Sequence, residues 1–381
     1  MDQEAQEKYR YSATIVQNVL ELVSSSVHVG SSVHSLCKYG DDLIRANVKT
    51  LFKKNKDMEK GISFPTSITI NNFIQNFSPP SSEDIIVGND DLVKIEISAH
   101  VDGYIVSLGK TVVAQSPPRA CLVDKRANVI AAAYYASEAA LRLFSPGKTS
   151  TDVTKAIKLV ADGFGCSIAE HSYTSQFDRF VISGKKTFPN KQRAEGPIIN
   201  FEFSAGEVYS IDIIMSTGTG FAKKTSVNPS IYTRNVNKSY QLKLKASRAL
   251  FSKVCTDHSV FPFLLRETID DRMRAGLNEC VKNQLLIPYA VSSDQNGEYV
   301  AQYKVTVFVH HNGPLRLTPV PEEPNVKPAV SIPQESEISV LLKTPVNMVS
   351  FASLPKNPEV EFLTSNFNSI VPEIDSEMMV E

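Results

Sequence analysis

Two strand-like runs that share one tight turn impose the strongest constraint on how this chain can fold. The runs are LVKIEISAHV (92–101) and GYIVSLGKTVV (103–113), and Asp102-Gly103 joins them. An Asp-Gly pair between strand-like runs is the strongest short-range signal for a β-hairpin, because the turn requires positive φ. We therefore expect a long antiparallel hairpin, which needs a larger sheet or packed helices around it to be stable.

Helical and strand-like patterns occur around this hairpin in the same order twice. In the first half, apolar residues at helical spacing (9–24 and 35–53) precede a strand-like run (61–72) and the hairpin. In the second half, helical runs at 128–144 and 151–163 precede strand-like runs at 207–216 and 299–309. Further helices are expected at 247–259 and 266–283. This order predicts an α+β fold with two related halves.

The overall charge and the absence of targeting signals limit the function classes. The chain has 40 Lys and Arg against 41 Asp and Glu, so its net charge is −1. This balance argues against a generally basic nucleic-acid binder, and any such activity must come from a local patch. The N-terminus is charged, and no run of about 18 apolar residues occurs. We expect a nuclear and cytoplasmic protein that is neither exported nor bound to a membrane.

The cysteines predict neither a disulfide framework nor a zinc site. The chain has 5 cysteines, which are scattered along the sequence without a C-x-x-C pair. A structural zinc site needs closely spaced pairs of thiolate or imidazole ligands. We therefore expect these residues to be small buried or half-buried side chains in a reducing compartment.

One segment departs from the charge balance. From Ile213 to Thr256 there is no Asp or Glu. The bases in this segment are Lys223, Lys224, Arg234, Lys238, Lys243, Lys245, Arg248 and Lys253. We expect them to bind phosphates with salt-sensitive affinity, and Tyr232 and Tyr240 to stack on bases or sugars. A preference for curved DNA would then come from its shape. The alternative is a solvated linker and helix face with no specific ligand.

The composition changes at about residue 315. The last 67 residues hold nine prolines, ten acidic residues and four basic residues. This composition predicts an extended strap and tail, whose final stretch (364–381) is acidic and mobile. We accordingly expect one domain over 1–314, followed by a proline-rich, acidic C-terminal strap and tail over 315–381.

Five stretches, in this order, resemble the methionine aminopeptidase superfamily. They are GISFPTSITINNFIQNFSP, DLVKIEISAHVDGYIVSLGKTVV, GEVYSIDIIMSTGTG, FPFLLRETID and YVAQYKVTVFV. Together they cover roughly 10–315 and include the helical insert of the type II branch. The segments LCKYGD, FKKNKDMEKGISFPTS and HNGPLRLT are most similar to the branch of proliferation-associated, receptor-binding and curved-DNA-binding proteins. The resemblance implies the pita-bread fold: two pseudo-symmetric helix–strand halves around a curved antiparallel sheet, with the insert at about 221–290.

The resemblance also implies where a metal site would lie. A two-metal aminopeptidase needs several anionic oxygens and an imidazole around two divalent cations. The family's metal-ligand positions correspond to Glu96, Ser107, Asp212 and Lys304, and its substrate-binding histidine corresponds to Asn76. The metal-binding histidine falls near Ser175 or Gln176, and His171 lies too early in the sequence for this position.

Lys304 and Ser107 argue against a working metal centre. A protonated amine has no lone pair to donate, and it repels dications. We therefore expect Lys304 to pair with Asp212 or Glu96 in a vestigial site that has no catalytic residue, no metal and no other cofactor. Without the resemblance, Glu96, Asp212 and Lys304 are ordinary strand residues.

The resemblance implies binding partners rather than a reaction. Our first hypothesis is a non-catalytic protein that binds curved DNA, structured RNA or ribosomal particles. The alternative is a protein-interaction module that uses the old peptide cleft, and a third hypothesis is an active peptidase with bound transition metal. Receptor-binding members end in a lysine-rich tract, whereas this sequence ends in EIDSEMMVE. We do not expect functions that depend on such a basic tract.

Overall fold

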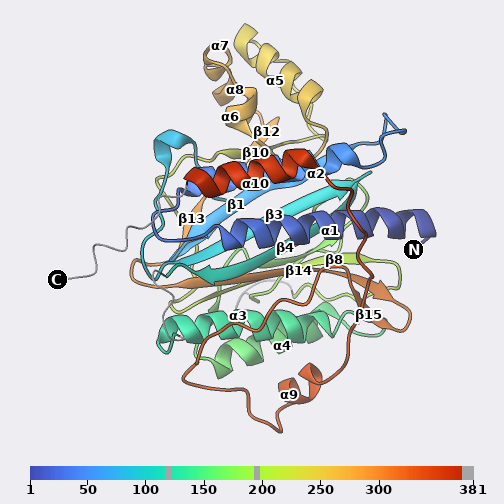
Figure 1. Ribbon diagram of the computed structural model, residues 1–381, viewed down its shortest axis with the longest axis vertical. Helices are drawn as coiled ribbons and strands as arrows, with labels where there is room; N and C mark the ends of the chain where they lie inside the picture. Colours follow the sequence, from blue (N-terminus) through green and yellow to red (C-terminus); the bar gives the residue numbers. More distant parts are fainter. Residues whose placement is uncertain (116–121, 193–197, 371–381) are drawn as a thin grey trace, which may run out of the picture.

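A large antiparallel sheet organises the computed structural model, which describes residues 1–115, 122–192 and 198–370 (Figure 1). Its main strands lie in the order β1-β3-β4-β14-β8-β6-β7. Their bounds are β1 (Lys60–Ile70), β3 (Leu92–Val101), β4 (Tyr104–Val113), β6 (Tyr173–Phe177), β7 (Phe188–Pro189), β8 (Val208–Ser216) and β14 (Val300–His310). Short strands extend it: β5 (Ser167–Ile168) pairs with β8, β15 (Gly313–Arg316) with β14, and β16 (Asn347–Met348) with β15.

The hairpin predicted at 92–113 is confirmed. Strands β3 and β4 pair in continuous register from Leu92↔Val113 to Val101↔Tyr104. Asp102 and Gly103 form the turn with φ of 55° and 78°. A side chain at Gly103 would be strained at this φ, and its Cβ would lie 2.4 Å from the ring of Phe180.

Four long helices cover one face of the sheet (Figure 1). They are α1 (Gln3–Ser25), α2 (Val33–Thr50), α3 (Lys125–Leu141) and α4 (Ser150–Gly163). Helix α4 begins with the predicted Thr-Asp signal, since Thr149 and Asp152 form a reciprocal capping box. Along β3, Ile95, Ile97 and Ala99 belong to the main hydrophobic core. Within the described residues, no helix combines the length and the apolar character needed to cross a bilayer.

The two halves expected from the sequence are present. Helices α1 and α2 pack on β1, β3 and β4, and α3 packs on β8 and β14 and against α4. The halves meet where β4 pairs with β14, and Lys304 lies opposite Gly109 there. A Cβ on Gly109 would approach the Lys304 Cβ to 3.1 Å, so the absence of a side chain at Gly109 lets β14 come close. The predicted α+β fold with a large antiparallel sheet is confirmed.

Residues 231–288, which we call the lobe, project from one end of the sheet (Figure 1). The lobe contains β10 (Ile231–Arg234), α5 (Lys245–Asp257), β11 (Phe263–Leu264), α6 (Leu265–Thr268), α7 (Asp271–Arg274), α8 (Leu277–Lys282) and β12 (Leu286–Pro288). It has its own hydrophobic core, in which Leu250, Val254 and Cys280 are fully buried. The helical run predicted at 266–283 is broken into three short helices. Ile269 is extended and Asp270 caps the helix that follows, so one continuous helix cannot form.

The lobe is connected to the sheet by a smaller sheet and by side-chain contacts. Strands β2 (Phe73–Gln75), β13 (Ser292–Ser293) and β9 (Lys223–Lys224) pair in the order β2-β13-β9. A short 3-10 helix (Ser81–Glu83) follows β2. Arg266 of α6 donates to the Ser78 carbonyl at 2.6 Å, and Glu267 pairs with Arg45 of α2 at 2.6 Å.

The C-terminal strap crosses the helical layer and includes α9 (Glu337–Leu342) and α10 (Pro358–Ile370). Helix α10 lies along α2 (Figure 1). Phe367 stacks on Tyr39 with ring centroids 4.2 Å apart, and Glu359 pairs with Lys49. The prediction of a mobile stretch from 364 is therefore wrong for 364–370, because α10 includes these residues and packs on α2. Residues 371–381 lie outside the described part of the chain.

Candidate functional site

A cavity of about 410 Å³ lies on the sheet face opposite the main core. In β3, Glu96 and Ser98 alternate with the core residues Ile95 and Ile97, so both polar side chains reach this second face. The cavity brings together all five of the positions implied by the resemblance: Glu96, Ser107, Asp212, Lys304 and Asn76. We call this cavity the cleft. These residues are far apart in sequence, and only strand pairing brings them together.

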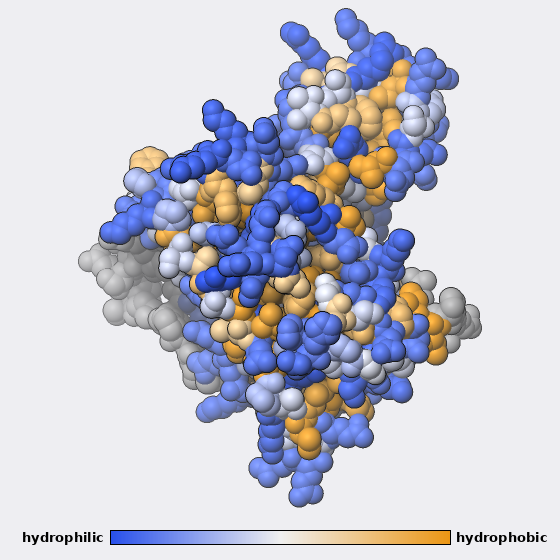
Figure 2. Space-filling model, turned by 90° about the vertical axis from the view of Figure 1, so that its right-hand side faces the viewer, coloured by the Kyte–Doolittle hydropathy of each residue, from blue (hydrophilic) through white to orange (hydrophobic). Residues whose placement is uncertain are grey.

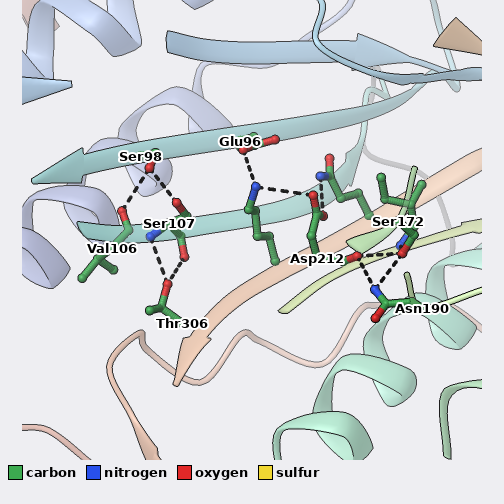
Figure 3. Close-up of polar contacts among 11 residues, drawn as sticks. Glu96, Ser98, Val106, Ser107, Ser172, Asn190, Asp212 and Thr306 are labelled. Atoms are coloured by element: carbon green, nitrogen blue, oxygen red, sulfur yellow. Dashed lines mark hydrogen bonds and ion pairs between the residues drawn. The ribbon is translucent and has the colours of Figure 1, made fainter. Parts of the chain in front are cut away.

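Lys304 lies between the two carboxylates of the cleft. Its Nζ is 2.6 Å from Glu96 Oε1 and 3.4 Å from Asp212 Oδ2 (Figure 3). Asp212 is held on its other side by Gln302, whose Nε2 donates to Oδ1 at 2.7 Å. The pairing expected from the sequence thus occurs with both carboxylates. Gln302 was not predicted, although it lies two residues before Lys304 on the same strand and therefore on the same face.

The charges of this group depend on one another. Burial raises the pKa of Asp212, while Lys304 lowers it and Glu96 raises it further. Burial lowers the pKa of Lys304, but attraction to Asp212 and Glu96 and hydrogen bonds to both outweigh burial, so this pKa rises above its ordinary value. Lys304 is therefore an ammonium ion at neutral pH.

Ser107 belongs to a chain of hydroxyl groups. Its Oγ lies 2.6 Å from Ser98 Oγ, which in turn lies 2.6 Å from Ser63 Oγ. Thr306 Oγ1 donates to the Ser107 carbonyl and accepts from its N–H (Figure 3). Each partner is neutral. The position therefore supplies no negative charge to the cleft.

The cleft also contains the segment where the metal-binding histidine was expected. Ser175 lines the cavity from β6 and pairs with Ser210 of β8. His171 lines the cavity as well, but it precedes β6 and is exposed, with φ of 67°. At the substrate-histidine position, Asn76 donates from Nδ2 to the Ala290 carbonyl at 3.1 Å.

This set of donors does not fit two divalent cations. Among the metal-ligand positions implied by the resemblance, only Glu96 and Asp212 are carboxylates, and the Lys304 ammonium ion lies within 3.4 Å of both. Two like charges about 4 Å apart repel by about 4 kcal/mol at an effective dielectric of 20. Across the described residues, no group of three or more His, Cys, Asp or Glu side chains is arranged to hold a metal ion.

The eight predicted phosphate-binding bases lie in two places. Lys223 and Lys224 form β9 of the small sheet, outside the lobe. The six others belong to the lobe: Arg234, Lys238, Lys243, Lys245, Arg248 and Lys253. Arg234 contacts Cys255 Sγ and the Ser259 carbonyl, and Lys253 pairs with Asp257. The bases of this segment are therefore divided between the small sheet and the lobe.

The two tyrosines of this segment differ in exposure. Tyr232 is buried in the core of the lobe and is 6% exposed, so the prediction that it stacks on bases is wrong. It belongs to the lobe core together with Phe263 and Leu286. Tyr240 lies in the loop before α5 and is 38% exposed.

Comparison with known proteins agrees with this architecture. Residues 7–184 match the model of metallopeptidase family M24. Proliferation-associated protein A of Dictyostelium discoideum is 38% identical over 311 residues, covering 82% of this chain and 81% of its own length. The curved DNA-binding protein of Schizosaccharomyces pombe is 33% identical over 361 residues, which cover 92% of this chain and 93% of its own length.

Solved structures give the fold. A thermophilic Arx1 superimposes with a TM-score of 0.80 at 26% identity, covering 91% of this chain and 100% of its own. A methionine aminopeptidase from Thermotoga maritima has a TM-score of 0.55 at 12% identity, covering 84% and 98%. The pita-bread fold expected from the sequence is confirmed.

Proposed function

Because this chain belongs to metallopeptidase family M24 yet places an ammonium ion between two carboxylates of its cleft, we propose that it is a non-catalytic member that acts by binding. Its ligands are structured RNA or curved DNA, free or within ribosomal particles. The same proposal places the protein in the nucleus and the cytoplasm. One relative is named for binding curved DNA, and we extend that property to this chain.

The charge of the lobe is the observation that carries the proposal. The lobe contains ten Lys and Arg but five Asp and Glu, which gives +5 in a chain of net charge −1, so the rest carries −6. Lys238, Lys243 and Lys245 are exposed, and none of them forms an ion pair with a described residue. A positive lobe on a negative body directs a polyanion to one end of the molecule.

Binding titrations at increasing salt test this proposal. We expect the variant with Lys243→Gln and Lys245→Gln to bind a structured RNA or curved DNA more weakly. For this variant, the slope of log affinity against log salt concentration should be shallower by about one for each lost phosphate contact. Glutamine is preferred to glutamate because Glu279 accepts from the backbone N–H groups of Lys243 and Leu244. New carboxylates there would disturb the fold.

A matched control uses two exposed lysines of the C-terminal strap. Lys327→Gln and Lys343→Gln remove the same charge at positions outside the lobe. This control should bind as the unchanged protein does. Equal weakening in both variants would remove the lobe from the proposal, and no measurable binding to any nucleic acid would overturn it.

The absence of catalysis is a separate part of the proposal and has its own test. We expect purified protein to contain no stoichiometric transition metal and to release no methionine from a Met-peptide after addition of Mn²⁺ or Co²⁺. Elemental analysis and a peptide-cleavage assay check this. Turnover that depends on added metal and disappears in Asp212→Asn would establish an active peptidase instead.

The size of the cleft supports a second candidate function. Its volume of about 410 Å³ and its apolar wall, which includes Phe64, Ile182 and Tyr289, suit a side chain of a bound peptide. A protein-interaction module of this kind would bind peptides as tightly after Lys243→Gln and Lys245→Gln as before. Peptide binding that these substitutions leave unchanged, without nucleic-acid binding, would favour this alternative.

A further inference from the structure

A loop at the edge of the lobe exposes large apolar side chains. Between β10 and α5, Val236 is 58% exposed, Tyr240 is 38% exposed and Leu244 is 50% exposed. Isolated exposed apolar side chains are common, but three on one short loop form a local surface that interacts poorly with water. In Figure 2 the lobe projects from the body, with hydrophobic residues showing between hydrophilic ones.

The ends of this loop are fixed. At its start, the N–H of Asn235 donates to the Leu285 carbonyl at 2.9 Å. At its end, the N–H groups of Lys243 and Leu244 donate to the Glu279 carboxylate at 2.7 and 3.0 Å. Arg248 of α5 also donates to the carbonyls of Leu242 and Lys243. The lobe therefore presents these side chains on a backbone whose ends are held in place, which lowers the entropic cost of binding.

Positive charges lie beside the apolar side chains. Lys238 and Lys243 alternate with Val236, Tyr240 and Leu244 along the loop. Neither lysine forms a salt bridge with a described residue, although the charge of Lys243 helps to lower the pKa of the Glu279 carboxyl. An aromatic ring between two exposed lysines matches a nucleotide, which has an aromatic base between two phosphates. Phosphates alone would leave the exposed ring without a partner.

We propose that this loop binds an unpaired base of a folded RNA, with Tyr240 stacked on the base and Lys238 and Lys243 on the flanking phosphates. The inference rests on the proposed function and narrows its ligand. Bases in a regular duplex are stacked on one another and have no free face, whereas bulges and loops of RNA present them. The lobe should therefore distinguish RNA with an unpaired base from a perfect duplex of the same charge.

Two RNA stems of equal length test the inference, one with a single-base bulge of 2-aminopurine and one fully paired. We expect full-length protein to bind the bulged stem on the order of tenfold more tightly and to quench its 2-aminopurine fluorescence. Tyr240→Ala should bind both stems alike and lose the quenching, while Tyr240→Phe should keep both properties. Phe362→Ala, which removes an exposed ring from α10, should behave as the unchanged protein.

The outcomes separate the inference from the function on which it rests. Equal binding to both stems by the unchanged protein would overturn the inference and leave nucleic-acid binding intact. No binding to either stem or to DNA would overturn both. Equal affinity for a bulged DNA stem would overturn the assignment to RNA. Discrimination between the two stems that Tyr240→Ala retained would show that Tyr240 does not stack on the unpaired base and would overturn the inference.

Discussion

Lys304 differs from a carboxylate at the same position chiefly in the charge that it gives to the cleft. A carboxylate at this position would add a third anion beside Glu96 and Asp212, and only a cation could balance the group. The ammonium ion of Lys304 supplies that balance from within the chain, at 2.6 and 3.4 Å from the two carboxylates. A buried ion pair of this kind adds little net stability over an apolar group, but removing one partner is costly.

Lys304→Met tests this balance. The substitution leaves Glu96 and Asp212 buried without a counter-charge, so we expect the free energy of unfolding at pH 7 to fall by about 3–5 kcal/mol. The loss should shrink as pH falls, because protonation relieves the repulsion. Urea denaturation at pH 7 and pH 5 measures this. Changing Glu96 to Gln and Asp212 to Asn in the Lys304→Met protein should restore most of the stability. A Lys304→Met protein with an unchanged free energy of unfolding would contradict this explanation.

Asp41 of α2 gives a prediction for pH dependence. It is fully buried, and its Oδ1 accepts from the Thr66 N–H at 2.8 Å while Oδ2 has no partner among the described residues. Burial raises its pKa to about 6 from an ordinary value of 3.8. Between these values the folded state holds a proton that the unfolded state has released, so this residue's contribution to stability falls as pH rises.

Asp41→Asn should remove that dependence. Relative to the unchanged protein, the variant should gain about 2 kcal/mol between pH 4.5 and pH 7. The free energy of unfolding of both proteins at each pH gives the difference. A constant difference across this range would show that Asp41 keeps an ordinary pKa in the folded protein.

At the scale of elements, the sequence predicts those turns and helix ends that a few neighbouring residues determine. The Asp102-Gly103 turn and the Thr149–Asp152 capping box fix a hairpin and a helix start within a few residues, and both occur as expected. Helix α10 was missed because its sequence lies in a proline-rich, acidic region. Pro358 at its start and two acids in its first turn are helix signals. However, its position depends on Tyr39, more than three hundred residues earlier.

The candidate site likewise depends on contacts between residues that are far apart in the sequence. The sequence identifies which residues of β3, β4, β8 and β14 share a face, because strand residues alternate. It does not give the register between strands from distant parts of the chain. That register puts Lys304 opposite Asp212 and beside Gly109, and it decides that one ammonium ion reaches both carboxylates.

The packing of α10 on α2 can be tested with one substitution. Phe367→Ala removes the ring that stacks on Tyr39, so we expect hydrogen exchange of the α10 amides to speed up by about tenfold. Global stability should change little, since most of α10 is exposed. Phe362→Ala on the same helix is the matched control, because this ring is 63% exposed and should leave exchange unchanged. Equal exchange in both variants would show that the stack does not hold α10.

At the scale of the whole molecule, the cleft and the loop before α5 are supported by two different hydrophobic cores. The main core supports the sheet and the cleft, and the small core of the lobe supports the loop before α5. Arg266 and Glu267 link them through Ser78 and Arg45. Because the links between them are few side-chain contacts, we expect a surface on one core to change without disturbing the other.

Leu250→Ala tests that independence. Leu250 is fully buried in the lobe core, and its truncation should cost about 2–5 kcal/mol. Because the lobe core is small, we expect amides of α5 and α8 to lose protection from hydrogen exchange while those of β3 and β8 keep theirs. Leu43→Ala in the main core, also fully buried, should reduce protection throughout the sheet. Uniform loss in the Leu250 variant would show one cooperative unit.

The contact between Lys304 and Glu96 crosses the seam where the two halves of the sheet join at β4 and β14. The residue that gives the cleft its positive charge thus also links the two halves of the sheet. Replacing it first by an acid would gather three anions at that seam before any cation is bound. Such a variant would fold poorly unless a bound cation balanced the three carboxylates.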